Sequence, residues 1–478
     1  MTIVSSGQTD IVSAGIVTDL TVLKGGTVIV RTGGITSGAA LSGGTEYVSS
    51  GSEAEATSVF KGGSLFVSSG GVASGVLVKS AGTETVYSGA SDTKAIVSGT
   101  GAIQYVDGGA TSGTAIRGSG TQIVSSGGIA TSSYIDKGGN QDVLSGGESK
   151  GATVILGGYL NVSSGGVAVN TNVKGGRLSV FSGGEAEHTN VTSGALWVYS
   201  GGTDFKSIIS ATAVEEITGS AISSIDYGLQ TVGSGGVASG SQVYYQQWLS
   251  GGQTEGSDVF SGASEVVYSG GLANSTIVSS GGNEVIFLRG AASGTLIEGG
   301  SMEVGSGGSA TDPTLAVSAG GLLDLVKDSK VSGSITFAIN AATLLIESQA
   351  MPTAIISGFA PTDVINLAAV KYSTTDTVFV TGNEASLITP TGTYTLDIAG
   401  ASNDTFEVLK ATSGTNLEIT NAGAVVPPGF NWQAMTPAAD RVGPSPTAFV
   451  MSANFGSVPA VTHGAEPVSM LAAPGERG

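Results

Sequence analysis

Few side chains in this 478-residue sequence belong to the types that carry out metal, nucleophilic or acid–base chemistry. There is no cysteine, and the two histidines, His188 and His463, have no second metal-ligating residue at a recognisable spacing. The Gly-Gly-x-Gly-x-Asp calcium repeat does not occur, and the Ser-Gly-Gly runs lack the strand, lysine and helix of a phosphate-binding loop. We therefore expect no metal, no cofactor and no catalytic residue.

Acidic residues are the remaining candidates for catalysis, because enzymes that cleave polysaccharides use carboxylates that converge on one site. Here the acidic residues scatter over different places in the sequence pattern described below: Glu46, Glu84, Asp107, Glu148, Glu185, Asp258, Glu265 and Glu298. This scatter predicts that the protein is not an enzyme. Polysaccharide binding or degradation stays as an alternative, since many polysaccharide-cleaving enzymes are β-helices.

Outward-facing aromatic residues are better candidates, for binding rather than catalysis. Rings on a surface suit the apolar faces of sugars and also protein partners. The candidates are Tyr47, Phe66, Phe181, Trp197, Tyr199, Tyr244, Tyr245 and Trp248. The alternative is that the rings only stack on one another and stiffen a sheet. The run from Tyr244 to Trp248 lies where the repeat is irregular, which predicts a bulge or a loop leaving the fold.

A glycine recurs about every 18 to 19 residues through the first two-thirds of the chain. It stands at Gly26, Gly44, Gly63, Gly82, Gly101, Gly120, Gly139, Gly158, Gly176, Gly194, Gly282 and Gly300, and Thr212, Gly228, Gln247 and Ala263 stand at the corresponding places in the irregular part. Such a period indicates stacked repeats, about seventeen of them before residue 320.

The residues between these glycines also recur in a fixed order. With the glycine as position 0, positions 2 and 4 are apolar, as at Leu65 and Val67, and this alternation predicts a half-buried strand. The Ser-Gly-Gly that follows predicts a corner. A small residue at position 10 and a β-branched residue at position 15 complete a unit of two short strands and two turns. Because positions 2 and 4 face inward, positions 3 and 5 face outward.

One such unit cannot close a core, but stacked units can. The predicted fold is therefore all-β, a parallel β-solenoid with a thin, continuous apolar core. The general preference of parallel crossovers favours a right-handed β-helix.

The composition divides the chain into three regions. Residues 1–320 hold the Gly/Ser-rich repeats, residues 321–423 hold richer apolar runs that predict larger coils or a β-rich cap, and residues 424–478 form a Pro/Ala/Gly-rich segment that predicts a flexible tail. The first residues show no secretory signal and match the end of an internal repeat. This predicts either that the chain is part of a longer protein or that its uncapped first coil associates end to end with a neighbour.

The charge and hydropathy of the sequence limit the classes of binding partner that we expect. The net charge is −19 with only 18 Lys plus Arg, which excludes nucleic acid because its binding needs a basic surface. No apolar run is long enough to cross a bilayer as a helix. We expect cell-surface or matrix components as partners, polysaccharide among them.

The recurring Gly-Thr-x-x-Val-Ser-Ser-Gly-Gly-x-Ala pattern, as at 120–130 and in varied form at 63–73, resembles the passenger repeats of AIDA-type autotransporter adhesins. The resemblance covers most of residues 1–320. It implies an extracellular or bacterial cell-surface β-helix that mediates adhesion, aggregation or biofilm formation. The family's repeats can be glycosylated, which makes Ser69, Ser126, Ser164 and Ser280 candidate acceptors. A self-assembling surface fibre or lattice component is the other alternative.

Overall fold

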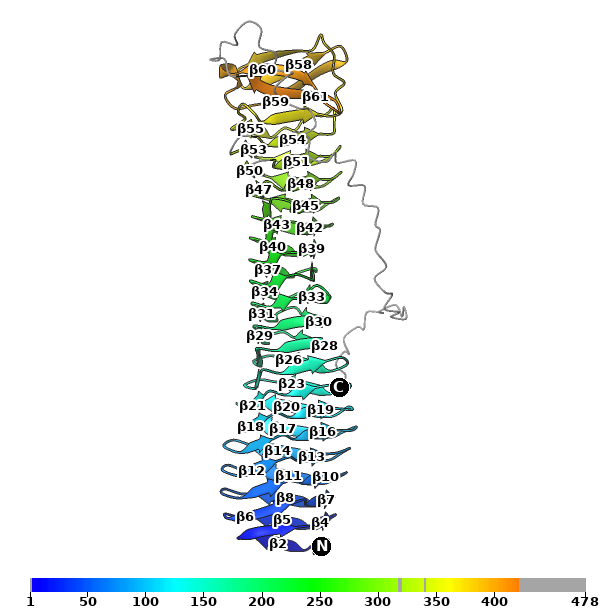
Figure 1. Ribbon diagram of the computed structural model, residues 1–478, viewed down its shortest axis with the longest axis vertical. Coiled ribbons are helices and arrows are strands. Elements are labelled where there is room, and N and C mark those ends of the chain that lie inside the picture. The colour runs from blue at the N-terminus through cyan, green and yellow to red at the C-terminus, as the bar shows by residue number, and fades with distance from the viewer. Residues whose placement is uncertain (1, 317–319, 339–340, 421–478) are drawn as a thin grey trace, which may run out of the picture. The chain divides into compact units, whose positions relative to one another are not determined.

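The chain folds into a stack of parallel β-coils. The computed structural model describes residues 2–316, 320–338 and 341–420. These residues form an all-β parallel β-solenoid of about 19 turns, so the predicted fold class is confirmed. Figure 1 shows successive coils stacked in chain order, from β2 to β54. The tail at 424–478 lies outside the described residues.

A typical coil carries three strands, one more than the sequence predicted, while β28 (Asn172–Val180) and β30 (Asn190–Val198) each join the third strand of one coil to the first strand of the next. In one typical coil the three strands are β11 (Ser64–Val67), β12 (Val72–Ser74) and β13 (Leu77–Val78). Gly75, between β12 and β13, has a φ of 63°. The same corner is occupied by Lys94, with a φ of 58°, and by His188, with a φ of 53°. Since a non-glycine residue often fills this third corner, the glycine pattern did not reveal it.

The first strand of each coil, here called the long strand, pairs in parallel with its counterparts above and below. β11 pairs with β8 so that Leu65 lies beside Glu46 and Val67 beside Val48. The same register runs through β2 (Thr9–Val12), β5 (Thr27–Val30), β8 (Thr45–Val48), β14 (Thr83–Tyr87), β17 (Ile103–Asp107), β20 (Thr121–Ser125), β23 (Asn140–Val143), β26 (Tyr159–Val162), β28 (Asn172–Val180), β30 (Asn190–Val198), β33 (Ala213–Ile217), β36 (Leu229–Val232), β39 (Gln246–Leu249), β42 (Ser264–Val267), β45 (Asn283–Ile286) and β48 (Ser301–Val304).

Burial along the long strand follows the predicted alternation. Leu65 and Val67, at positions 2 and 4, are fully buried, and Phe66 between them is half-buried on the outside. Side chains at one position therefore form a column along the solenoid, with neighbours about 4.8 Å apart.

Two different constraints select glycine. Gly70, in the corner after β11, has a φ of +76°, which other residues rarely adopt. Gly63, a member of the glycine series, has no such φ, but a Cβ there would collide with the Leu41 carbonyl oxygen of the preceding coil. At Gly63 the sequence's corner interpretation is thus incomplete, because the residue is also needed for the close approach of two coils.

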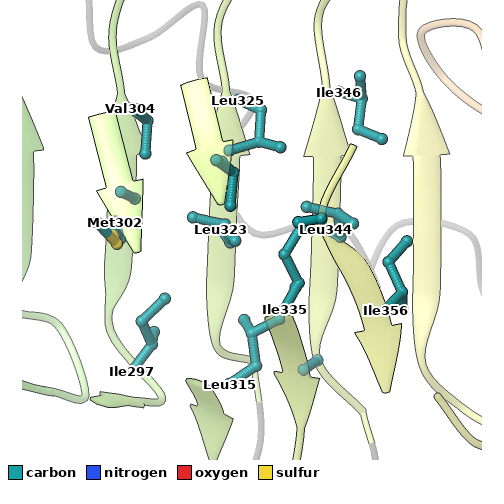
Figure 2. Packing of buried hydrophobic residues seen from close by; sticks show 14 of the residues in the cluster. Ile297, Met302, Val304, Leu315, Leu323, Leu325, Ile335, Leu344, Ile346 and Ile356 are labelled. Carbon is teal, nitrogen blue, oxygen red and sulfur yellow. The ribbon is translucent and has the colours of Figure 1, made fainter. Parts of the chain in front are cut away.

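Parallel stacking continues past residue 320. β51 (Leu322–Leu325) pairs in register with β48, β54 (Thr343–Ile346) with β51, and β56 (Val364–Leu367) with β54. Figure 2 shows the resulting apolar columns, in which Met302, Leu323 and Leu344 succeed one another. The strands that follow are antiparallel: β57 (Thr377–Thr381), β58 (Glu384–Thr389) and β59 (Gly392–Asp397) form one sheet, and β60 (Thr405–Lys410) pairs with β61 (Thr415–Thr420), which joins β56.

Candidate functional site

The candidate aromatic residues nearest the N-terminus, Tyr47 and Phe66, stack on aromatic rings of adjacent coils. Tyr47 and Phe66, both at position 3, lie with ring centroids 5.2 Å apart and planes at 16°. Phe66 also stacks on Tyr87 at 6.3 Å. Tyr47 is nevertheless 42% exposed, so the column stiffens the sheet and still presents an aromatic surface.

A second aromatic group surrounds β30. Phe181 and Tyr199 stack with centroids 4.9 Å apart and planes at 5°. Trp197 meets Tyr199 edge to face at 6.0 Å. The Arg177 guanidinium lies 4.4 Å from the centroid of Trp197 and 5.0 Å from that of Tyr159, so a cation–π contact holds the indole from the preceding coil.

The run from Tyr244 to Trp248 was wrongly predicted to be a bulge or a loop leaving the fold. Gln246–Leu249 is β39, paired in register on both sides, and Tyr244 and Tyr245 form a tight corner between β38 (Gln242–Val243) and β39. The irregularity comes from this corner, which has two residues where the coil with β41 (Asp258–Val259) and β42 has four. Tyr244 stacks on Tyr227 at 4.8 Å and on Phe260 at 4.5 Å, and Tyr245 is 48% exposed.

Several rings of these groups were missed by the sequence analysis. Tyr268, which meets Trp248 edge to face at 6.3 Å and stacks on Phe287 at 5.4 Å, occupies position 5, as Tyr199 does. Counting positions through the irregular coils would have found it. Tyr227 and Phe260 lie in a corner, where the alternation makes no prediction.

The four candidate serines are all exposed, but they do not form one row. Ser69, Ser126 and Ser164 lie in the corner that follows a long strand, whereas Ser280 lies in the corner that precedes one. Hydroxyls are therefore presented along two separate edges of the solenoid. His188 is also exposed, at the third corner; His463 lies outside the described residues.

The position-0 residues of three coils were wrongly assigned from the sequence. Strand pairing puts Ala102, Ala213 and Tyr245 at this position instead of Gly101, Thr212 and Gln247, so Gln247 faces inward at position 2.

The interior differs most from expectation, because position 2 is not apolar throughout. At this inward position, groups of coils with apolar residues alternate with groups of coils with polar residues. The fully buried polar residues are Glu46, Glu84, Gln104, Gln122, Gln141, Glu215, Gln230, Gln247, Glu265 and Glu284. The predicted continuous apolar core is thus wrong. The predicted scatter of acidic residues is also wrong for Glu46, Glu84 and Glu265, which share this position.

Hydrogen bonds along the column explain how buried polar side chains are accommodated. The Gln104 amide donates to Glu84 at 2.9 Å and to Asp92 at 2.7 Å. The Gln122 side-chain amide donates to Oε1 of Gln104 at 2.7 Å, and the Gln141 side-chain amide donates to Oε1 of Gln122 at 2.5 Å. Each coil therefore supplies the acceptor for the next one.

Three buried carboxyl groups form a cluster in the coils that contain β30 and β33. They belong to Asp204, Glu215 and Asp226. Burial raises the pKa of Glu215 to about 7. Burial, and then repulsion from Glu215, raises the pKa of Asp204 and of Asp226 well above the usual range. Both oxygens of Asp226 lack a hydrogen-bond partner. Protonation removes the cost of burying these charges.

All three carboxyl groups of this cluster are fully buried. Within the described residues, no group of three or more His, Cys, Asp or Glu side chains is arranged to hold a metal ion. The same residues include no helix of the length and apolarity needed to cross a membrane.

The fold defines a β-solenoid repeat protein. Its exterior carries aromatic rings and exposed serines in the corners, and its interior includes groups of buried polar side chains. No protein-family model matches the chain, and no curated protein matches it. Among solved structures, it is similar to a TibA fragment described as hyper-glycosylated by TibC, with 32% sequence identity over 60% of this chain and 94% of the fragment and a TM-score of 0.44.

Proposed function

We propose that this chain is an extracellular or cell-surface structural protein that mediates adhesion, aggregation or biofilm and matrix assembly. The observation that supports this proposal most is the division between its exterior and its interior. Exposed serines and aromatic rings recur on the outside over many coils, whereas the carboxyl cluster of Asp204, Glu215 and Asp226 is fully buried inside. A surface of this kind offers repeated weak contacts, and repetition raises avidity without a single strong site.

The proposal excludes catalysis. Polysaccharide cleavage needs carboxyl groups that face the substrate, and Glu84 with Asp92 is a fully buried pair. Glu303, Asp324 and the exposed Glu347 also converge, and burial together with repulsion from Glu347 and Glu303 raises the pKa of Asp324 to about 7. These three are the carboxyl groups that the polysaccharide-cleaving alternative would have to use. A structural use for the polar interior, in which coils are linked by side-chain hydrogen bonds, accounts for the buried pair.

Adhesion can be tested by displaying the chain on a non-aggregating bacterial strain. We expect faster settling of the cells, or greater attachment to host cells or abiotic surfaces, than for cells that display an unrelated protein at the same density. Equal settling and equal attachment would contradict the proposal. Ordered fibres or lattices formed by the purified chain alone would favour the self-assembling alternative and its end-to-end association instead.

Glycosylation of the corner serines is part of the proposal. Hyper-glycosylation is a property of the TibA fragment; for this chain the supporting fact is that Ser69, Ser126, Ser164 and Ser280 are all exposed. We expect the intact mass of protein from its native host to exceed the sequence mass by whole sugar units, and a Ser69→Ala, Ser126→Ala, Ser164→Ala variant to lose part of that excess. An unmodified mass would contradict this expectation.

A further inference from the structure

Two aromatic pairs border a polar stretch on the outer face of the long strands. The first pair is Trp197 with Tyr199, whose planes meet at 84°, and the second is Trp248 with Tyr268, whose planes meet at 85°. Strand pairing puts them in the same columns. At position 3, Trp197 lies beside Glu216, Glu216 beside Thr231, and Thr231 beside Trp248. The two indoles are therefore three strand spacings apart, about 14 Å.

The floor between the pairs is low and polar. At position 5, the residues from one tyrosine to the other are Thr218, Gly233 and Ser250, none with a large side chain. The corner after β33 also recedes, because two residues separate Ile217 from Ser220, where four separate Val198 from Thr203. The result is an open groove of about 390 Å³ at the Trp248 end of this stretch, lined by Glu216, Thr231, Val232, Gly233, Trp248, Ser250 and Tyr268. Trp197 lies one strand beyond Glu216, outside this lining.

The rings at both ends are held from outside the groove. Phe181 and Arg177 lie in the coil before Trp197 and support Tyr199 and Trp197 respectively. Phe287 lies in the coil after Tyr268 and stacks on it at 5.4 Å with planes at 14°. Each support therefore lies on the side away from the floor. Walls fixed in this way lose little side-chain entropy when a ligand binds.

The chemistry of this groove suits a sugar. Aromatic rings pack against the apolar faces of sugar rings, and the exposed Glu216 carboxylate can accept hydrogen bonds from sugar hydroxyls. The Thr231 hydroxyl donates to the Glu215 carbonyl oxygen at 3.3 Å, so its lone pairs remain free to accept. None of the lining residues is basic, and the chain carries a net charge of −19. An acidic sugar would therefore be repelled by Glu216, because Arg177 lies on the side of Trp197 away from the groove.

We propose that the groove lined by Glu216, Trp248 and Tyr268 binds a short, non-acidic oligosaccharide, which can extend towards Trp197. The inference deepens the proposed adhesive function by naming the class of ligand, and it rests on that function only for its biological setting. Saccharide binding by the purified chain and adhesion by displaying cells are separate measurements. Binding without adhesion would overturn the proposed function alone, and adhesion without binding would overturn the groove alone.

The test is titration of the purified full chain with cellotriose and with N-acetylchitotriose, followed by tryptophan fluorescence and calorimetry. Trp248 lines the groove and Trp197 lies one strand beyond Glu216, so we expect a saturable fluorescence change with at least one trisaccharide. Trp248→Ala should weaken binding at least tenfold, and Glu216→Gln should weaken it severalfold. Tyr105→Ala removes an exposed outer ring from a coil far from the groove and should leave affinity unchanged.

Three results would overturn the proposal. One is no saturable binding of either trisaccharide at millimolar concentration. The second is equal affinity in Trp248→Ala when its circular dichroism shows an intact fold. The third is tighter binding of trigalacturonate than of the two uncharged sugars, because that would require a basic site elsewhere.

Discussion

Raising the pH from 5 to 8 is expected to lower the free energy of unfolding of the coils around Glu215 by several kcal/mol. Burial raises the pKa of the Glu215 carboxyl from its usual 4.5 to about 7. Between these two values the folded state binds more protons than the unfolded state, so stability falls as the pH rises, by about 3 kcal/mol from this one group. Asp204 and Asp226 have raised pKa values as well and act in the same direction.

Glu215→Gln should remove much of this pH dependence. Glutamine is already the position-2 residue of the next two coils, at Gln230 and Gln247, so the site accepts it sterically. Glu216→Gln is the matched control, because this neighbour in the same strand is exposed. Solenoid coils unfold partly independently, and the measurement is therefore amide hydrogen exchange in β33 and β36 together with denaturant unfolding at several pH values. Stability that increases from pH 5 to pH 8 would contradict the protonated interior.

Gly139→Ala is expected to destabilise its coil by about 3 kcal/mol, although it adds a single methyl group. The Cβ would collide with the Ile116 carbonyl oxygen, which belongs to the backbone of the preceding coil and cannot turn away. Restoring the space would require the two coils to separate and their ladder of hydrogen bonds to lengthen. The change should appear as a lower denaturation midpoint and faster exchange in β20 and β23.

Gly127→Ala provides the comparison. Gly127 has a φ of +86° but nothing within 4 Å of an added Cβ, so only backbone strain is introduced, about 1 kcal/mol. If both variants lose the same stability, close approach between coils is not what selects glycine at Gly139.

The glycine period was sufficient to predict the parallel stack, because a repeat of this length has few ways to bury its apolar residues. It was insufficient for the number of strands per coil. The third corner depends on a left-handed backbone conformation that Lys94 and His188 adopt as well as glycine, and no residue type marks it.

The polar interior could have been found from sequence. Gln104, Gln122 and Gln141 follow one another at the repeat spacing, in the position that Leu65 and Leu160 fill in other coils. Burying a single side-chain amide costs free energy because its hydrogen bonds are lost, but amides stacked in a column can hydrogen-bond to one another. These hydrogen bonds can be predicted only when the register between coils is known. The outer groove is harder to predict, since it depends on a corner that is two residues shorter than its neighbours.

The central claim is that the outer surface binds while the buried carboxyl groups only stabilise the stack. It is tested most directly by incubating the purified chain with a panel of neutral and acidic polysaccharides and measuring their chain length and new chain ends. Polysaccharides of unchanged length, with no new reducing or unsaturated ends, are the predicted result. New ends that accumulate in proportion to protein and time would contradict the account and establish an enzyme.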